Sequence, residues 1–200
     1  MSADRQRQTF AIHPYRIFVF LIIAAISVLF MSLTISYGYT RFEKGIDAIP
    51  VPPIFLINTL LLVASSFCLV KAKKSYRNDA ADPLKTLLLW TILLSFVFMI
   101  SQIFGWLQLF ENNLPVGLNN GVSYLYLISG VHFAHILVGL PFLISFYLGA
   151  RKSVVEPVSE LLYFTDPEKK VKLDLLTIYW HFLDILWIYL VVFFAINSII

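Results

Sequence analysis

The chain is poor in charged residues and has a single cysteine. Only 14% of its 200 residues are charged, whereas 59% are hydrophobic. A soluble domain of this length needs far more polar surface to cover itself, so the composition excludes a water-soluble globular fold. The one cysteine, Cys68, lies in an apolar run, and alone it can form neither an intrachain disulfide nor a thiolate metal site.

The motifs of many soluble enzymes are also missing. The sequence has no glycine-rich phosphate loop, no HExxH zinc motif and no Gly-x-Ser-x-Gly nucleophile elbow. The net charge of +3 is not typical of a nucleic-acid-binding protein, because the basic residues fall in short loops rather than on one exposed face. We therefore expect no nucleic-acid partner.

Long apolar runs take the place of these features. A run of about 20 residues is long enough to cross a hydrocarbon core of about 30 Å, and in lipid each crossing segment must be a helix to satisfy its own backbone. The first run is longer than a signal-peptide core and no small-x-small cleavage site follows it, so we expect it to be retained. We predict an all-α, polytopic membrane bundle that forms a single transmembrane domain over residues 1–200. The five predicted transmembrane helices cover residues 17–37, 53–70, 84–110, 121–149 and 173–199.

Basic residues alternate between the loops in a way that predicts an orientation. Thirteen of the 15 Lys and Arg residues flank the spans on one side, which the positive-inside rule makes cytoplasmic. The N-terminus is then cytoplasmic and the C-terminus lies outside. The only sizeable segment expected outside the membrane, residues 150–172, is too short for a catalytic domain. The basic residues on the cytoplasmic side are Arg5, Arg7, Arg16, Lys71, Lys73, Lys74, Arg77, Lys85, Arg151, Lys152, Lys169, Lys170 and Lys172.

Four ionisable residues lie deep inside the last two spans. His132 and His135 are three residues apart in the fourth span, and His181 and Asp184 have the same spacing in the fifth, so each pair shares one helix face. A rise of about 1.5 Å per residue puts both pairs near the middle of the membrane. We therefore hypothesise a hydrogen-bonded cluster that joins the two helices, with Asp184 paired to a histidine.

Such a cluster has a functional and a structural interpretation. Three histidines and an aspartate resemble a metal site, and histidines on two helices at one depth could hold a haem. The structural interpretation is that the polar groups satisfy one another where water is absent. We favour it because Asp184 is the only carboxylate available, whereas metal sites in helix bundles use several. Interhelical hydrogen bonds are likewise expected of Asn58, Thr59 and Gln102.

These polar positions stand in motifs that resemble subunit III of the haem-copper terminal oxidases. Residues 179–187, YWHFLDILW, are similar to the YWHFVDxxW signature of that family's last helix. The fourth span is similar to its G-x-H-x-x-H-x-x-x-G helix, and the second to its LNTxxLLxSS pattern. The positions that carry the resemblance are Tyr179, Trp180, His181, Phe182, Asp184 and Trp187, then Gly130, His132, His135 and Gly139, then Asn58, Thr59, Ser65, Ser66 and Gln102.

The resemblance implies a non-catalytic subunit of a cytochrome c or quinol oxidase that reduces O2 to water and pumps protons. Subunit I would hold the haems and copper and contact this chain directly, with subunit II and other oxidase subunits nearby. The chain itself would bind structural phospholipids and support proton uptake, oxygen access and sustained activity. Its expected location is a bacterial cytoplasmic (inner) membrane, with a respiratory supercomplex as a candidate wider partner.

The chain departs from the family in ways that leave alternatives open. Five spans match the short bacterial form, which lacks the first two helices. The first span has no acidic residue, so a proton-related role of the family's glutamate there does not transfer, and Gly105 stands where the family has another glutamate. One alternative is the subunit III-like component of a nitric oxide reductase. Another is a b-type cytochrome or membrane metalloenzyme that uses the histidines directly. The electron donor and haem types are determined by other chains.

Overall fold

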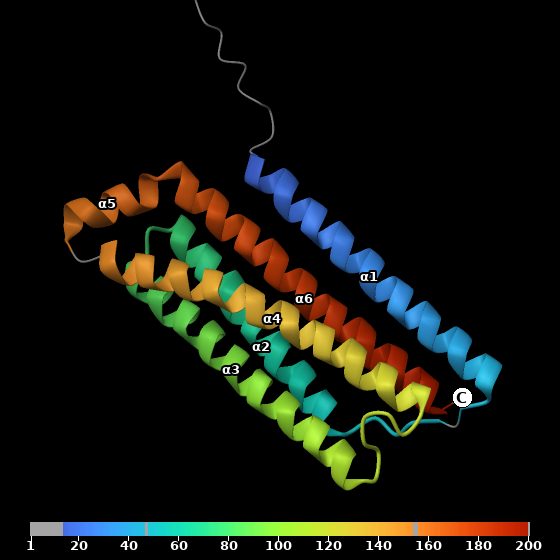
Figure 1. The fold of residues 1–200 in the computed structure, drawn as a ribbon. Coiled ribbons are helices and arrows are strands. Elements are labelled where there is room, and N and C mark those ends of the chain that lie inside the picture. The colour runs from blue at the N-terminus through green and yellow to red at the C-terminus, as the bar shows by residue number, and fades with distance from the viewer. Residues whose placement is uncertain (1–13, 47, 154–155, 200) are drawn as a thin grey trace, which may run out of the picture.

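The computed structural model describes residues 14–46, 48–153 and 156–199, except the side chain of Pro157. This part of the chain forms five long helices and one short one (Figure 1). Arg5 and Arg7 of the predicted basic tail lie outside the described residues. The helices are α1 (Pro14–Lys44), α2 (Ile54–Arg77), α3 (Ala81–Glu111), α4 (Asn120–Ser153), α5 (Pro157–Thr165) and α6 (Pro167–Ile199).

The five long helices correspond to the five predicted spans. Each is long and apolar enough to cross a membrane, which confirms the predicted number of apolar helices within the described ranges. All five extend beyond the apolar runs that predicted them. For example, α2 continues past Val70 to Arg77 because lysine and arginine side chains carry their charge to the surface while their stems cover apolar helix. Hydropathy therefore gave boundaries that were too short.

The long helices run antiparallel along one bundle axis (Figure 1). α2 and α3 form a closely packed hairpin, and both lie beside the α4–α6 part of the bundle. α1 packs on α4 and α6, and its buried residues Ile26, Phe30, Thr34 and Tyr37 form a single narrow stripe. The remaining circumference of α1 is exposed, as expected for a helix that faces lipid.

Two glycines let neighbouring helices come close together. A Cβ atom added to Gly139 of α4 would lie 2.8 Å from Cε1 of Tyr179 and 3.2 Å from Cζ3 of Trp180, both on α6. A Cβ atom at Gly105 of α3 would lie 3.1 Å from Cε1 of Phe55 on α2. Small residues at helix contacts are the usual way in which membrane helices approach. The contact at Gly105 also explains why a glutamate does not fit at that position here.

The short helix α5 was not predicted. The sequence indicated only an extramembrane segment over residues 150–172, but nine of these residues form a helix that begins with a capping box between Glu156 and Ser159. Tyr163 of α5 is buried, and the hydroxyl of Tyr76 on α2 donates to its carbonyl at 3.2 Å. α5 therefore docks on the end of the bundle at which α2 finishes.

The antiparallel order brings the basic flanks of the helices to the same end of the bundle. Arg16 lies at the beginning of α1, Arg77 at the end of α2 and Arg151 at the end of α4, and these termini lie at the end of the bundle that carries α5 in Figure 1. We call this the basic end. The opposite end carries Arg41 and Lys44, in the last turn of α1.

Candidate functional site

His181 of α6 lies against α2. Its Nδ1 atom forms a hydrogen bond of 2.6 Å with the Ser66 hydroxyl and lies 4.0 Å from Oδ2 of Asp184, one turn further along α6. Asp184 is 4% exposed, and its Oδ2 atom has no hydrogen-bond partner among the described residues. Ser66, His181 and Asp184 therefore form a small polar contact between α2 and α6.

The histidines of α4 have other surroundings. His132 is fully buried, and its ring packs against Phe30, Phe98 and Trp187 with centroids 6.4, 6.1 and 5.0 Å apart. Neither of its ring nitrogens has a hydrogen-bond partner in the described chain. His135 instead donates from Nδ1 to the carbonyl oxygen of Val131, 2.7 Å away and one turn back on the same helix.

These contacts differ from the hypothesis of one four-residue hydrogen-bonded cluster. The structure brings Asp184 and His181 together, but His181 bonds to Ser66 of α2, and His132 and His135 of α4 have no side-chain hydrogen bond to this pair among the described contacts. The physical reason is helix rotation: the residue count along a helix predicts the depth of a side chain but not which neighbour it faces. Ser66 was not predicted as the partner of His181, although its place in the LLxSS pattern could have indicated it.

The aromatic residues of the last-helix motif lie on different sides of α6. Trp180 and Trp187 are seven residues apart, and both are 1% exposed within the bundle. Tyr179 packs against Gly139, and its hydroxyl donates to the carbonyl oxygen of His135 at 3.1 Å. Phe182 is half-buried at the edge of the core. The motif therefore supplies the packing surface that α6 offers to α2, α3 and α4.

A second polar contact joins α2 to α3. Asn58 donates from Nδ2 to Oε1 of Gln102 at 2.9 Å, and both side chains are fully buried. This is the kind of interhelical hydrogen bond that we expected of these residues. Thr59 differs, because its hydroxyl donates to the carbonyl of Phe55 on its own helix. Gly130 has only Trp106 near it, with Cζ2 4.0 Å from the position of an added Cβ atom.

An ion pair near the basic end joins α2 and α6 again. Nζ of Lys73 lies 2.7 Å from Oδ1 of Asp174, and both side chains are about three-quarters buried, with 26% and 21% exposed. From the sequence, Lys73 was predicted only as a loop charge, and Asp174 was not singled out. The sequence could have indicated this pair, because the two residues have opposite charges and lie at the same end of two predicted spans.

The described side chains do not form a cluster that would suit a metal ion. In residues 14–46, 48–153 and 156–199, no group of three or more His, Cys, Asp or Glu side chains is arranged to hold a metal ion. The ring of His132 is enclosed by aromatic side chains.

These features define a class: a multi-pass helical membrane protein in which several of the described polar groups connect helices. The profile of the family described as "Cytochrome c oxidase subunit III" matches residues 9–198. The chain therefore belongs to the cytochrome c oxidase subunit III family.

Individual relatives have names of two kinds. The "Probable cytochrome c oxidase subunit 3" of Rickettsia prowazekii is 28% identical over 150 residues, which are 75% of this chain and 49% of the relative. The "Probable quinol oxidase subunit 3" of Staphylococcus saprophyticus is 24% identical over 161 residues, 79% of this chain and 74% of the relative. The "Cytochrome c oxidase subunit 3" of Corynebacterium diphtheriae is 25% identical over 159 residues, 80% of this chain and 72% of the relative. The chain thus spans about half the length of the Rickettsia relative and about three-quarters of the other two.

Proposed function

We propose that this chain is the non-catalytic subunit III of a haem-copper oxidase that takes electrons from cytochrome c or a quinol. The single observation that carries the proposal is the family match, which covers nearly the whole chain, residues 9–198. The names of the relatives include both kinds of oxidase, so they do not favour one electron donor. O2 reduction and the haems and copper then belong to subunit I, beside which this chain packs, together with subunit II.

The proposed orientation has the basic end in the cytoplasm of a bacterium. Arg16, Arg77 and Arg151 support it, because Lys and Arg are retained on the cytoplasmic side of membrane proteins. The first residues of the chain then lie inside and the end of α6 lies outside. A thiol-reactive, membrane-impermeant reagent tests the orientation on single-cysteine variants in intact cells, after Cys68 is replaced by alanine. Labelling at Asn113→Cys but not at Asn78→Cys is expected, and the reverse pattern would contradict the orientation.

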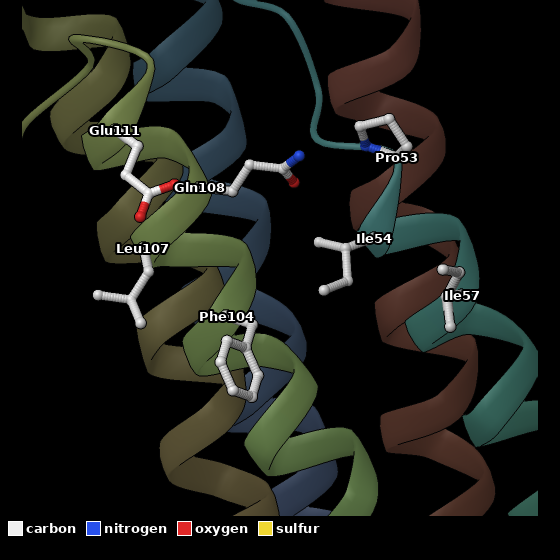
Figure 2. Close-up of a pocket in the computed structure, with 7 residues that line it drawn as sticks. All are labelled: Pro53, Ile54, Ile57, Phe104, Leu107, Gln108 and Glu111. Carbon is white, nitrogen blue, oxygen red and sulfur yellow. The ribbon is translucent and has the colours of Figure 1, made fainter.

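A structural phospholipid is the second part of the proposal. A pocket of about 610 Å³ opens where α2 begins and α3 ends (Figure 2). Ile54 and Ile57 line it from α2, and Phe104 and Leu107 line it from α3, as an acyl chain requires. Glu111 near the rim supplies a negative charge that suits a headgroup with an ammonium, such as ethanolamine or choline. The remaining lining residues are Pro53 and Gln108.

Lipid analysis of the purified chain tests this pocket. The variant Ile57→Trp fills it from α2, and the matched variant Leu60→Trp puts the same ring on an exposed part of the same helix. We expect less co-purified zwitterionic phospholipid with Ile57→Trp and an unchanged amount with Leu60→Trp. Equal lipid content in the two variants would argue against the pocket as a lipid site.

Copurification tests the oxidase assignment. The tagged chain, extracted from its native membrane in mild detergent, is expected to carry a haem-containing catalytic subunit with an oxidase spectrum and O2-consuming activity. A partner that reduces nitric oxide instead would overturn the assignment. So would a Soret band that stays with this chain after every other subunit is removed, because the haem would then belong to this chain.

The proposed supporting role has its own test. Asp184→Ala removes one member of a buried polar contact at a cost of about 1–3 kcal/mol, and we expect it to weaken assembly and shorten the active lifetime more than it lowers the first turnovers. Thr59→Ala is the matched control, because its hydroxyl bonds only within α2. Immediate loss of O2 reduction in an intact Asp184→Ala complex would contradict a supporting role.

A further inference from the structure

One stripe of α6 stays exposed along most of the helix, between α1 and α2 (Figure 1). On one side of it α6 contacts α2, where His181 bonds with Ser66. On the other side α6 contacts α1, where the hydroxyls of Thr34 and Tyr189 lie 2.9 Å apart. We call this stripe the open face of α6. Besides His181, it contains Ile178, Ile185, Tyr189, Val192 and Ile196, which follow one another at helical spacing and are 37–65% exposed.

His181 places an ionisable group on the open face near the middle of the membrane. It lies three positions after Ile178 and four before Ile185, so the three side chains share one stripe. About 12 Å of helix separates it from Leu173, where the apolar run begins. In a hydrocarbon core of about 30 Å this is a few ångströms from the midplane. The side chain of His181 is 29% exposed, so the bundle does not enclose it.

Lipid is a poor cover for this part of the open face. Nδ1 of His181 is hydrogen-bonded to the Ser66 hydroxyl, whereas no described residue forms a hydrogen bond with Nε2. Acyl chains offer this nitrogen no partner, and an imidazole is too short to reach a lipid headgroup from the middle of the membrane. Ionisable side chains inside membranes almost always face protein or a polar cavity. The exposed imidazole therefore indicates that another protein segment covers the open face.

The position of the open face favours a single helix over a second copy of this chain. In a symmetric dimer both partners present the same face to each other. Here each copy would have to bring its α6 past the α1 and α2 helices that lie on either side of it. A single helix has no such neighbours. The aliphatic members of the face, Ile178, Ile185, Val192 and Ile196, are β-branched, so they lose little side-chain freedom when a helix packs on them.

We propose that the open face of α6 is the docking surface for one transmembrane helix of another oxidase subunit, which forms a hydrogen bond with Nε2 of His181. This inference rests on the proposed function, because it requires that the chain assembles with other oxidase subunits. The partner helix carries a polar side chain, such as serine, threonine, asparagine or glutamine, near the middle of the membrane. Hydrogen bonds of this kind and close packing hold membrane helices together, since lipid tails are as apolar as the helices.

Photo-crosslinking in the complex purified from its native membrane tests the docking surface. Ile185→benzoylphenylalanine puts a reactive ring on the open face, where Ile185 is 65% exposed. Val97→benzoylphenylalanine is the matched control, because Val97 is 48% exposed near the middle of α3, which packs on α2 and α4. We expect adducts with a transmembrane helix of another oxidase subunit from position 185 and adducts with lipid from position 97. Lipid adducts alone at 185, or adducts with a second copy of this chain, would overturn the proposal.

The hydrogen bond itself is tested by the rate at which the crosslinked partner leaves the complex in detergent. His181→Leu should speed its dissociation about tenfold, the factor that corresponds to a loss of about 1.4 kcal/mol. Ser66→Ala removes the bond to Nδ1 but leaves Nε2 available, so its dissociation rate should be native. Equal rates for the two variants would overturn the role of His181.

The same crosslinks separate this inference from the proposed function. If the chain copurifies with an oxidase and position 185 gives only lipid adducts, the docking surface is refuted and the proposed function stands. If position 185 crosslinks to a transmembrane helix of a complex that is not an oxidase, the proposed function is refuted and the open face remains a docking surface.

Discussion

Gly139 offers a test of the helix packing with a matched control on the same helix. In Gly139→Ala, the new methyl group meets Cε1 of Tyr179 at 2.8 Å and Cζ3 of Trp180 at 3.2 Å unless α4 and α6 move apart. Both distances are shorter than the optimal contact of about 3.5–4.0 Å between carbon atoms. In Gly130→Ala the nearest atom, Cζ2 of Trp106, lies 4.0 Å away, so the methyl group fits.

The expected changes in the free energy of unfolding follow from two opposing effects. Replacing glycine by alanine inside a helix stabilises it by about 0.5–1 kcal/mol at either position. Overpacking at a tight contact costs about 1–3 kcal/mol. Gly130→Ala should therefore be neutral or more stable than the native chain, whereas Gly139→Ala should be less stable by up to about 2 kcal/mol. The free energies of unfolding of the two variants should differ by about 1–3 kcal/mol.

The assay is unfolding of the purified chain in mixed micelles of a mild and a denaturing detergent, followed by tryptophan fluorescence. A cycle with Tyr179→Ala identifies the cause, because the penalty of Gly139→Ala should shrink when the ring that it meets is absent. Equal effects of the alanines at 139 and 130, or an undiminished penalty in the Tyr179→Ala background, would refute the packing argument.

Three further predictions concern single contacts. A double-mutant cycle of Lys73→Met and Asp174→Asn should give a coupling of up to about 1 kcal/mol that weakens in high salt, and zero coupling would contradict the ion pair. Asn58→Ala leaves the buried amide of Gln102 without its donor and should lower the free energy of unfolding by about 1–3 kcal/mol in the same micelle assay. Burial, with smaller effects of Tyr76 and Asp166, raises the pKa of Tyr163 above its ordinary value. The contribution of docked α5 to the free energy of unfolding should therefore be fully present below the ordinary tyrosine pKa of about 10 and should decline as the pH rises above it. In Tyr163→Phe this loss of stability at alkaline pH should be absent.

The number of long helices could be predicted from the sequence, but the short helix could not be predicted from hydropathy. Each long helix contains an apolar run that has to form helix in lipid, whatever its neighbours are. α5 contains only nine residues and lies between charged segments, so no apolar run marks it. Its local signal was present all the same: Glu156 and Ser159, three residues apart, form the capping box at its first turn.

The sequence predicted that His181 and Asp184 share one helix face, but not the direction in which that face points. Counting residues placed His181 and Asp184 near the middle of the membrane, and the structure brings these two together. Counting residues could not show that His181 faces Ser66 of α2 rather than the histidines of α4, because the direction that a side chain faces depends on how its helix is rotated in the bundle. Lys73 was missed because the basic residues of the loops were read for orientation only, and Asp174 because only the residues deep inside the predicted fifth span were considered.

The sparse packing of α1 has a consequence for how the chain is made. α1 is synthesised before the helices on which it packs, α4 and α6, which begin only at Asn120 and Pro167. When α1 enters the bilayer, α4 and α6 are therefore not yet present to cover its buried stripe. Of the five long helices it has the most apolar stretch and the smallest buried share, with no charged residue between Arg16 and Arg41. A carboxyl group in the middle of α1 would oppose insertion at that early moment, and the stretch between Arg16 and Arg41 contains none.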